Sequence, residues 1–209
     1  MSISNSVVSD KDGFYERLKT LLNFESFNHT KLIRSLPRDT FYLPSLLPSL
    51  ALRAFNNHYD LLFDSGKFKH LLRPLPASFG CHNDEDGLAL AYLLRPFLQN
   101  LLGSEIAIFP SYCYYSIYPV GSNLPPHTDR EGCDLTLAIY LADGLPEFQP
   151  RTLLSVPTSA EDTAIKGYCG DGVVFYGRDV VHWRNADTTN NCVVRTAMFH
   201  FCFQNPLRK

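Results

Sequence analysis

The chain lacks the long apolar segments that cross membranes. No run of about 18 apolar residues occurs, so a transmembrane helix is not expected. The opening residues, MSISNSVVSDKDGF, contain no basic stretch followed by an apolar one, so no secretory leader is expected either. The 209 residues include 19 Lys and Arg against 21 Asp and Glu, a formal net charge of -2. This balance argues against a general attraction to nucleic acid or to an anionic membrane surface.

Paired cysteines are missing as well. None of the six cysteines forms a Cys-x-x-Cys pair, and Cys113, Cys192 and Cys202 stand in apolar, aromatic or β-branched runs. Reduced, buried thiols of this kind favour a cytoplasmic protein without a disulfide framework. No repeat, low-complexity tract or linker is visible, and 45% hydrophobic with 19% charged residues is a globular composition. We therefore expect one domain over residues 1–209.

Residues 1–104 have the pattern of a mainly helical support region. Apolar side chains recur at helical spacing over residues 12–24. Residues 45–63 are rich in Leu, Ala and Phe, and Pro44 and Pro48 mark the start of a second helix.

A third helix is expected to begin near Asp84, because acidic residues follow there and suit the N-terminal end of a helix dipole. It should stop before Gly103. The preceding segment, LLRPLPASFG, is expected to be a loop because of its prolines and glycine.

Residues 105–209 change to short runs rich in β-branched and aromatic residues, separated by Gly, Pro, Asn or Asp. These runs are IAIF, YCYYSIYPV, DLTLAIYL, RTLLSV, GVVFY, DVVHW and NCVVRTAMFHFCF. Strands that follow a block of helices indicate an α+β fold. We expect a sandwich or jelly roll with the N-terminal helices packed on one face.

Three residues could bind one metal ion. His127 and Asp129 form a His-x-Asp motif after the turn-like segment GSNLPP, and residues two apart in a strand point to the same face. His182 is expected to end a short strand after the turn that follows GVVFY, which can bring it back to the motif. Two His and one carboxylate make the facial triad of non-haem Fe(II) sites, which leaves coordination positions open. A His-x-Asp motif alone carries little weight.

Arg195 lies in the apolar run NCVVRTAMFHF, where a charge is unfavourable unless it is paired. By the period of two, it shares its face with Val193, Ala197 and Phe199. A bound carboxylate would satisfy the planar fork of the guanidinium. A salt bridge to a distant Asp or Glu is the alternative.

The order of these elements, His-x-Asp, then a second His, then an Arg in the following strand, resembles the 2-oxoglutarate/Fe(II)-dependent dioxygenase superfamily. The prolyl-hydroxylase-like members are the most similar, because they carry a tyrosine in a strand before the metal motif. Here that tyrosine is Tyr118, in the segment Tyr-Pro-Val-Gly. The resemblance covers approximately residues 105–203.

The resemblance implies a double-stranded β-helix, related to the jelly-roll and cupin folds. Fe(II) would be held by His127, Asp129 and His182, which are then also the catalytic residues, and 2-oxoglutarate by Arg195 and Tyr118. With O2, such an enzyme hydroxylates a C–H bond of a small amino-acid-like, peptide or biosynthetic substrate and releases succinate and CO2.

Arg178, Trp183 and Arg184 flank His182 and are candidates for contact with a polar or anionic substrate, a solvated loop charge being the alternative. Two other functions stay open. One is a cupin-type metal-binding sensor or binding module without turnover, which needs no carboxylate anchor. The other is a nucleic-acid demethylase on the same scaffold, although such enzymes typically end in an Arg-rich strand. We expect a small-molecule or peptide substrate, and no nucleic-acid or membrane partner.

Overall fold

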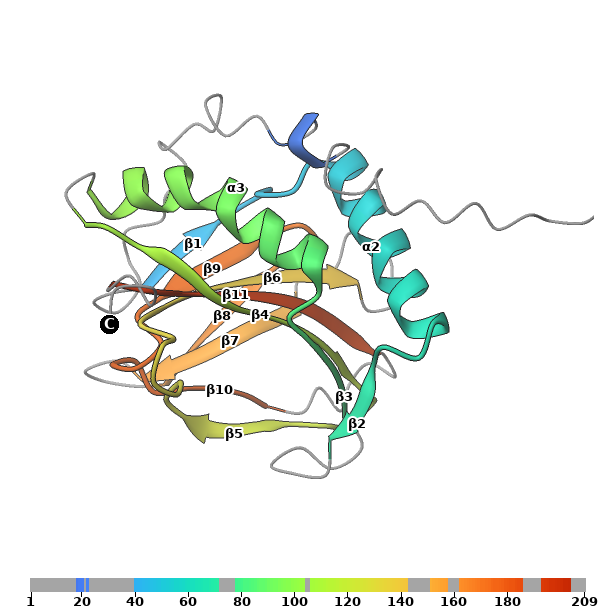
Figure 1. The fold of residues 1–209 in the computed structure, drawn as a ribbon. Coiled ribbons are helices and arrows are strands. Elements are labelled where there is room, and N and C mark those ends of the chain that lie inside the picture. Colours follow the sequence, from blue (N-terminus) through green and yellow to red (C-terminus); the bar gives the residue numbers. More distant parts are fainter. Residues whose placement is uncertain are drawn as a thin grey trace, which may run out of the picture.

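The computed structural model of the protein describes residues 18–20, 22, 40–71, 78–103, 106–142, 151–157, 162–185 and 193–203. They form two antiparallel sheets, with two helices over one face of the larger sheet (Figure 1). The helices are α2 (Ser49–Asp64) and α3 (Glu85–Leu102). The strands are β1 (Thr40–Leu43), β2 (Lys69–Leu71), β3 (Ser78–His82), β4 (Phe109–Tyr118), β5 (Leu124–His127), β6 (Leu135–Ala142), β7 (Arg151–Pro157), β8 (Asp162–Gly167), β9 (Gly172–Phe175), β10 (His182–Arg184) and β11 (Val194–Cys202).

The larger sheet has the strand order β1-β9-β6-β11-β4-β3-β2, and the smaller sheet has the order β5-β10-β7-β8. The chain therefore crosses repeatedly between the sheets: β5 lies opposite its sequence neighbours β4 and β6, and β10 lies opposite β9 and β11. This alternation produces the double-stranded β-helix, a relative of the jelly roll. The α+β fold class predicted from the sequence is confirmed.

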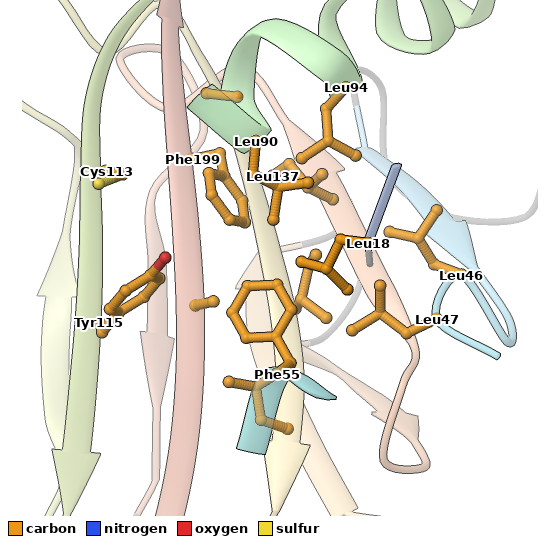
Figure 2. Packing of buried hydrophobic residues seen from close by; sticks show 14 of the residues in the cluster. Leu18, Leu46, Leu47, Phe55, Leu90, Leu94, Cys113, Tyr115, Leu137 and Phe199 are labelled. Carbon is orange, nitrogen blue, oxygen red and sulfur yellow. The ribbon is translucent and has the colours of Figure 1, made fainter. Parts of the chain in front are cut away.

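The main core lies between the helices and the outer face of the larger sheet. Phe55 of α2 and Leu90 of α3 pack there against Tyr115 and Phe199 of the sheet, and all four are at most 1% exposed (Figure 2). The Phe55 ring makes edge contacts with Tyr115 and Phe199, at centroid distances of 6.0 and 6.3 Å. This packing stabilises the large sheet from outside and leaves its inner face available to form a site.

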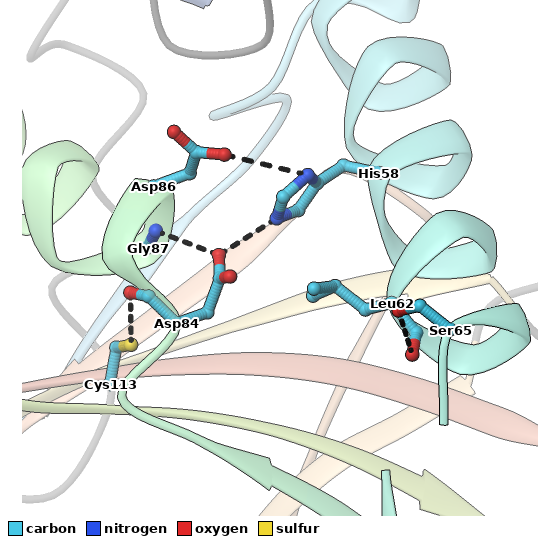
Figure 3. A network of polar contacts seen from close by, with 7 residues as sticks. All are labelled: His58, Leu62, Ser65, Asp84, Asp86, Gly87 and Cys113. Carbon is cyan, nitrogen blue, oxygen red and sulfur yellow. Dashed lines mark hydrogen bonds and ion pairs between the residues drawn. The ribbon is translucent and has the colours of Figure 1, made fainter. Parts of the chain in front are cut away.

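Both helices begin where the sequence predicts. The N-cap of α2 is Pro48. The Asp84 side chain caps α3 by accepting a hydrogen bond from the Gly87 N–H (3.1 Å), and the helix ends at Gly103, whose φ of 104° suits glycine. Asp84 also lies 2.8 Å from His58 Nε2 of α2 (Figure 3). This contact connects the two helices, and we interpret it as structural.

The N-terminal half contains three strands that the sequence analysis did not predict, since β1, β2 and β3 join the edges of the large sheet. The predicted loop LLRPLPASFG includes the start of β3 at Ser78, and residues 72–77 are outside the described residues. Strands of three to five residues are too short to show a clear period. Most of the helix predicted over residues 12–24 also lies outside the described residues; residues 18–20 are helical.

Two further strands were missed in the second half. β5 has the sequence Leu-Pro-Pro-His, and prolines are tolerated there because the strand is at an edge of the smaller sheet. β8 lies at the opposite edge. Neither α2 nor α3 is long and apolar enough to cross a membrane.

Candidate metal centre and its cavity

β5 and β10 bring the three predicted metal ligands together. His127 and His182 are directly paired in the antiparallel register of these two strands. Asp129 follows β5, and its N–H donates to the Gly177 carbonyl (2.7 Å) in the turn before β10. His182 therefore begins its strand, whereas the sequence analysis placed it at a strand end. The pairing is set by which strands are neighbours in the sheet, which local patterns do not encode.

The three side chains lie close enough to hold one ion. One potential ligand atom from each lies within 4.8 Å of those of the other two. His182 Nε2 is 3.6 Å from Asp129 Oδ1, and the two imidazole centroids are 4.3 Å apart. His182 is 3% exposed, so the centre is shielded on that side.

Backbone carbonyls orient both imidazoles. His127 Nδ1 lies 2.9 Å from the Pro125 carbonyl oxygen, and His182 Nδ1 lies 2.9 Å from that of Val180. Carbonyls only accept, so each Nδ1 carries the proton and each Nε2 is left with a lone pair. Burial is the main cause that lowers the pKa of His182, and this favours the neutral ring that a metal requires. The donor set of two imidazoles and one carboxylate fits Fe(II).

Two residues that were not predicted from the sequence orient Asp129, Thr136 directly and His200 through Thr136. The Thr136 hydroxyl donates to Asp129 Oδ2 (2.5 Å), and Thr136 Oγ1 lies 2.9 Å from His200 Nδ1. Because the single Thr136 proton goes to the carboxylate, His200 donates to Thr136. Burial lowers the pKa of His200 to about 4, so it is neutral at pH 7. The signal in the sequence that could have identified Thr136 and His200 is that both are polar residues within largely apolar strands.

Gly177 leaves the space that the Asp129 carboxylate occupies. A Cβ at this position would lie 2.2 Å from Asp129 Oδ2, 2.7 Å from Thr136 Oγ1 and 2.8 Å from the Cys133 carbonyl oxygen. No side chain fits there without displacing the carboxylate or the backbone. Asp129 Oδ2 is thus enclosed, whereas Oδ1 faces His182.

The triad opens into a cavity of about 400 Å³ between the two sheets. Its wall also includes residues of the larger sheet: Tyr112, Tyr114, Tyr118, Thr136, Ala138, Phe175, Thr196, Met198 and His200. The volume is in the range of small-molecule sites. The tyrosines of β4 that alternate in the sequence therefore line the interior of the barrel.

A buried arginine lies on the cavity wall. Arg184 is 5% exposed, and its guanidinium carbon lies 4.1 Å from the centroid of the Tyr118 ring. Arg184 Nη2 also donates to the Ser122 carbonyl (3.4 Å). Burial is the main cause that raises the pKa of Tyr118, so its phenol stays protonated and can donate a hydrogen bond. Arg184 and His182 alternate on β10 and both line the cavity.

Arg195 lies on the opposite side of the large sheet from the cavity, so it is not where the resemblance implied that it would bind 2-oxoglutarate. It forms an ion pair with Asp60 of α2 (2.6 Å), and its guanidinium carbon is 5.4 Å from the Tyr59 centroid. The predicted period is right, since Arg195 shares its face with Ala197 and Phe199. That face packs against the helices. The salt bridge to a distant carboxylate, the alternative in the sequence analysis, is what the structure shows.

The three candidates for substrate contact lie in different environments. Arg178 is exposed and forms an ion pair with Asp134 (3.1 Å). Trp183 is 9% exposed, is paired with Ser155 of β7, and does not line the cavity. Only Arg184 of the three predicted substrate residues lies on the cavity wall.

No family model and no curated protein matches the chain. Several solved structures do match the chain. A Pseudomonas putida prolyl-4-hydroxylase is 15% identical with a TM-score of 0.61, covering 80% of this chain and 94% of that one. A Trichoplax adhaerens prolyl hydroxylase, solved with a hypoxia inducible factor peptide fragment, is 16% identical with a TM-score of 0.60 and covers 90% of each chain.

A third structure is HygX from Streptomyces hygroscopicus, solved with nickel, 2-oxoglutarate and hygromycin B. It is 10% identical with a TM-score of 0.59, covering 78% of this chain and 82% of that one. At these identities the similarity shows the fold. The chain therefore has the double-stranded β-helix fold of the 2-oxoglutarate/Fe(II) oxygenases, the superfamily that its motifs resemble.

Proposed function

We propose that the protein is a non-haem Fe(II) and 2-oxoglutarate-dependent oxygenase that hydroxylates a C–H bond of a small-molecule or peptide substrate. The observation that carries this proposal is the convergence of His127, Asp129 and His182 on a cavity that also contains the buried Arg184. The fold neighbours support it, because one of them was solved with nickel and 2-oxoglutarate. The balanced reaction converts substrate, 2-oxoglutarate and O2 into hydroxylated substrate, succinate and CO2.

The triad would hold Fe(II) through the two Nε2 atoms and Asp129 Oδ1. A bound iron supplies the site for O2 activation, driven by oxidative decarboxylation of the co-substrate. The protein orients the ligands: carbonyls fix the two imidazoles, and Thr136 occupies Asp129 Oδ2. Because Thr136 occupies Oδ2, Asp129 would offer a metal its Oδ1 atom, and three protein ligands would leave positions for the co-substrate and O2.

Arg184 and Tyr118 would bind the far carboxylate of 2-oxoglutarate. Two positions along a strand span about 6.6 Å, so Arg184 lies one such step beyond His182. This separation suits a five-carbon diacid whose other end reaches the metal. The buried guanidinium supplies charge-assisted hydrogen bonds, and the protonated Tyr118 phenol can supply another.

The test is succinate formation by the full chain reconstituted with Fe(II) under air. His127→Ala and His182→Ala should abolish both Mn(II) binding and succinate formation, because each removes one of three ligands. Full turnover in either variant contradicts the metal assignment. Metal binding without succinate formation from any substrate tested would instead favour the binding module without turnover.

The two arginines provide a matched comparison. Arg184→Gln should raise the KM for 2-oxoglutarate by about ten- to hundredfold, as expected for a lost charge-assisted contact. Arg195→Gln removes the same charge outside the cavity, so the KM should stay within about twofold of wild type. The reverse result would restore Arg195 as the anchor.

A further inference from the structure

We infer that the cavity mouth is a recognition site for an anionic substrate with a flat, unsaturated ring. The mouth consists of His82, Tyr112, Tyr114 and Arg130, all on the cavity wall. The inference rests on the proposed function, because the charge count below includes a bound metal and 2-oxoglutarate.

Exposure along β4 defines the mouth and the floor of the cavity. Tyr118 is 3% exposed and lies beside the buried Arg184, whereas Tyr112 and Tyr114 are half-buried. His82 and Arg130 are exposed. A substrate that enters while 2-oxoglutarate occupies the floor therefore meets Tyr112, Tyr114 and their two exposed neighbours.

The mouth presents aromatic faces in a fixed arrangement. The Tyr112 and Tyr114 rings are nearly parallel, with centroids 6.3 Å apart and an interplanar angle of 9°. His82 lies against both rings, at centroid distances of 5.5 and 4.7 Å. These rings pack against one another and also line the cavity. Aromatic rings attract one another in offset or edge-to-face contact, so a planar aromatic group is a better partner for this wall than a puckered one.

Gly80 of β3 sets the position of Tyr114. A Cβ at Gly80 would lie 2.6 Å from Tyr114 Cε2 and 2.7 Å from its hydroxyl oxygen. The Tyr114 ring therefore lies directly against the β3 backbone, which restricts its rotation. A wall whose rings are held before binding loses little entropy when a ligand stacks on it.

The charges on the cavity wall favour an anion. Asp129, Arg130 and Arg184 are the charged groups among the described residues that line the cavity. His82 is neutral at pH 7, because partial desolvation of its ring and then the Arg130 charge lower its pKa. Fe(II) and Arg184 are balanced by Asp129 and the 2-oxoglutarate dianion, so one positive charge remains, that of Arg130.

Arg130 is placed to act with the aromatic wall. Its guanidinium carbon lies 4.2 Å from the Tyr112 centroid, so the cation lies over the ring, and Arg130 is exposed to solvent. A substrate carboxylate or phosphate can pair with it while the substrate ring packs against the parts of the tyrosines that line the cavity. A cationic substrate would be repelled by the same charge.

The experiment compares four probes on the full chain loaded with Mn(II) and saturating 2-oxoglutarate without O2. Hydrocinnamate, hydrocinnamamide and phenylpropylamine share one ring and differ in charge, and cyclohexylpropionate replaces the flat ring of hydrocinnamate. The relaxation of probe protons by Mn(II), followed by NMR, gives both affinity and proximity to the metal. Hydrocinnamate should bind about tenfold more tightly than its amide, and the amine more weakly still. It should also bind more tightly than cyclohexylpropionate.

Substitutions test whether residues of the mouth cause the preference for an anionic probe with a flat ring. Arg130→Gln should bring the affinities for hydrocinnamate and its amide within about twofold, whereas Arg130→Lys retains part of the difference. Tyr112→Leu should reduce the preference for the flat ring. Arg178→Gln removes an exposed arginine outside the cavity and should leave every ratio unchanged.

The outcomes separate this inference from the proposed function. Equal affinities for all four probes, or the same loss of preference in Arg178→Gln as in Arg130→Gln, overturn the inference while succinate formation stands. A chain that binds neither Mn(II) nor 2-oxoglutarate overturns both.

Discussion

Replacement of Thr136 by Val should weaken metal binding, although the two side chains have nearly the same shape. Thr136 is 1% exposed, and its hydroxyl donates to Asp129 Oδ2 at 2.5 Å while it accepts from His200. Valine substitutes a methyl group for the hydroxyl, so the carboxylate loses the donor that orients it. Loss of such a supporting hydrogen bond typically weakens metal affinity by about ten- to hundredfold. This corresponds to about 1.4–2.8 kcal/mol.

The assay is titration of Mn(II) into the metal-free chain, followed by the electron paramagnetic resonance signal of the free ion. Thr136→Ser keeps the hydroxyl and is the matched control, so it should bind Mn(II) within about threefold of wild type. Thr136→Val also leaves the buried His200 donor without its acceptor, at an expected cost of about 1–3 kcal/mol in unfolding free energy. Urea denaturation measures that cost separately. Wild-type Mn(II) affinity in Thr136→Val would refute the reasoning that Thr136 positions Asp129.

Two further substitutions and one labelling experiment test other parts of the structure. Gly177→Ala should abolish Mn(II) binding in a folded chain, because the new Cβ would lie 2.2 Å from Asp129 Oδ2; binding close to that of wild type would show that the turn can move. Phe55→Ala should lower the unfolding free energy by about 3–5 kcal/mol in urea denaturation, since its ring is fully buried, and a loss below about 1 kcal/mol would contradict its central place in the core. Native Cys113 should resist iodoacetamide at pH 8, because burial raises its pKa to about 12 and leaves about one thiolate in ten thousand. The partly exposed Cys169 should react before Cys113, and mass spectrometry of the labelled peptides decides.

The boundaries of α3 illustrate what local sequence predicts well. An aspartate cap, an acidic first turn and a terminal glycine all act within a few residues, so Asp84 and Gly103 could be assigned without tertiary information. The short strands β1, β2 and β3 lack such signals. They are stabilised by pairing with distant strands, and a few residues of alternation cannot show which partner they will have.

The His-x-Asp motif was recognisable because its two side chains are close in sequence. Its convergence with His182 depends on β5 and β10 being neighbours in the smaller sheet. The turn after GVVFY made this approach possible, but the sequence did not show which strands pair. The support of Asp129 by Thr136 and His200 depends on β6 and β11 being neighbours in the larger sheet. Such contacts cannot be derived from either strand separately.

The sequence by itself determined the α+β class, the main helices and most of the core strands, because periodicity, caps and turn residues are local properties. It also determined that Arg195 shares a face with Ala197 and Phe199. Only the tertiary structure decided which face of β11 points into the barrel, because apolar side chains occur on both faces of this strand and it is the helices that bury one face while the other lines the cavity. For the same reason it was the structure that placed Arg184, on a strand of three residues, inside the cavity and Arg195 outside it.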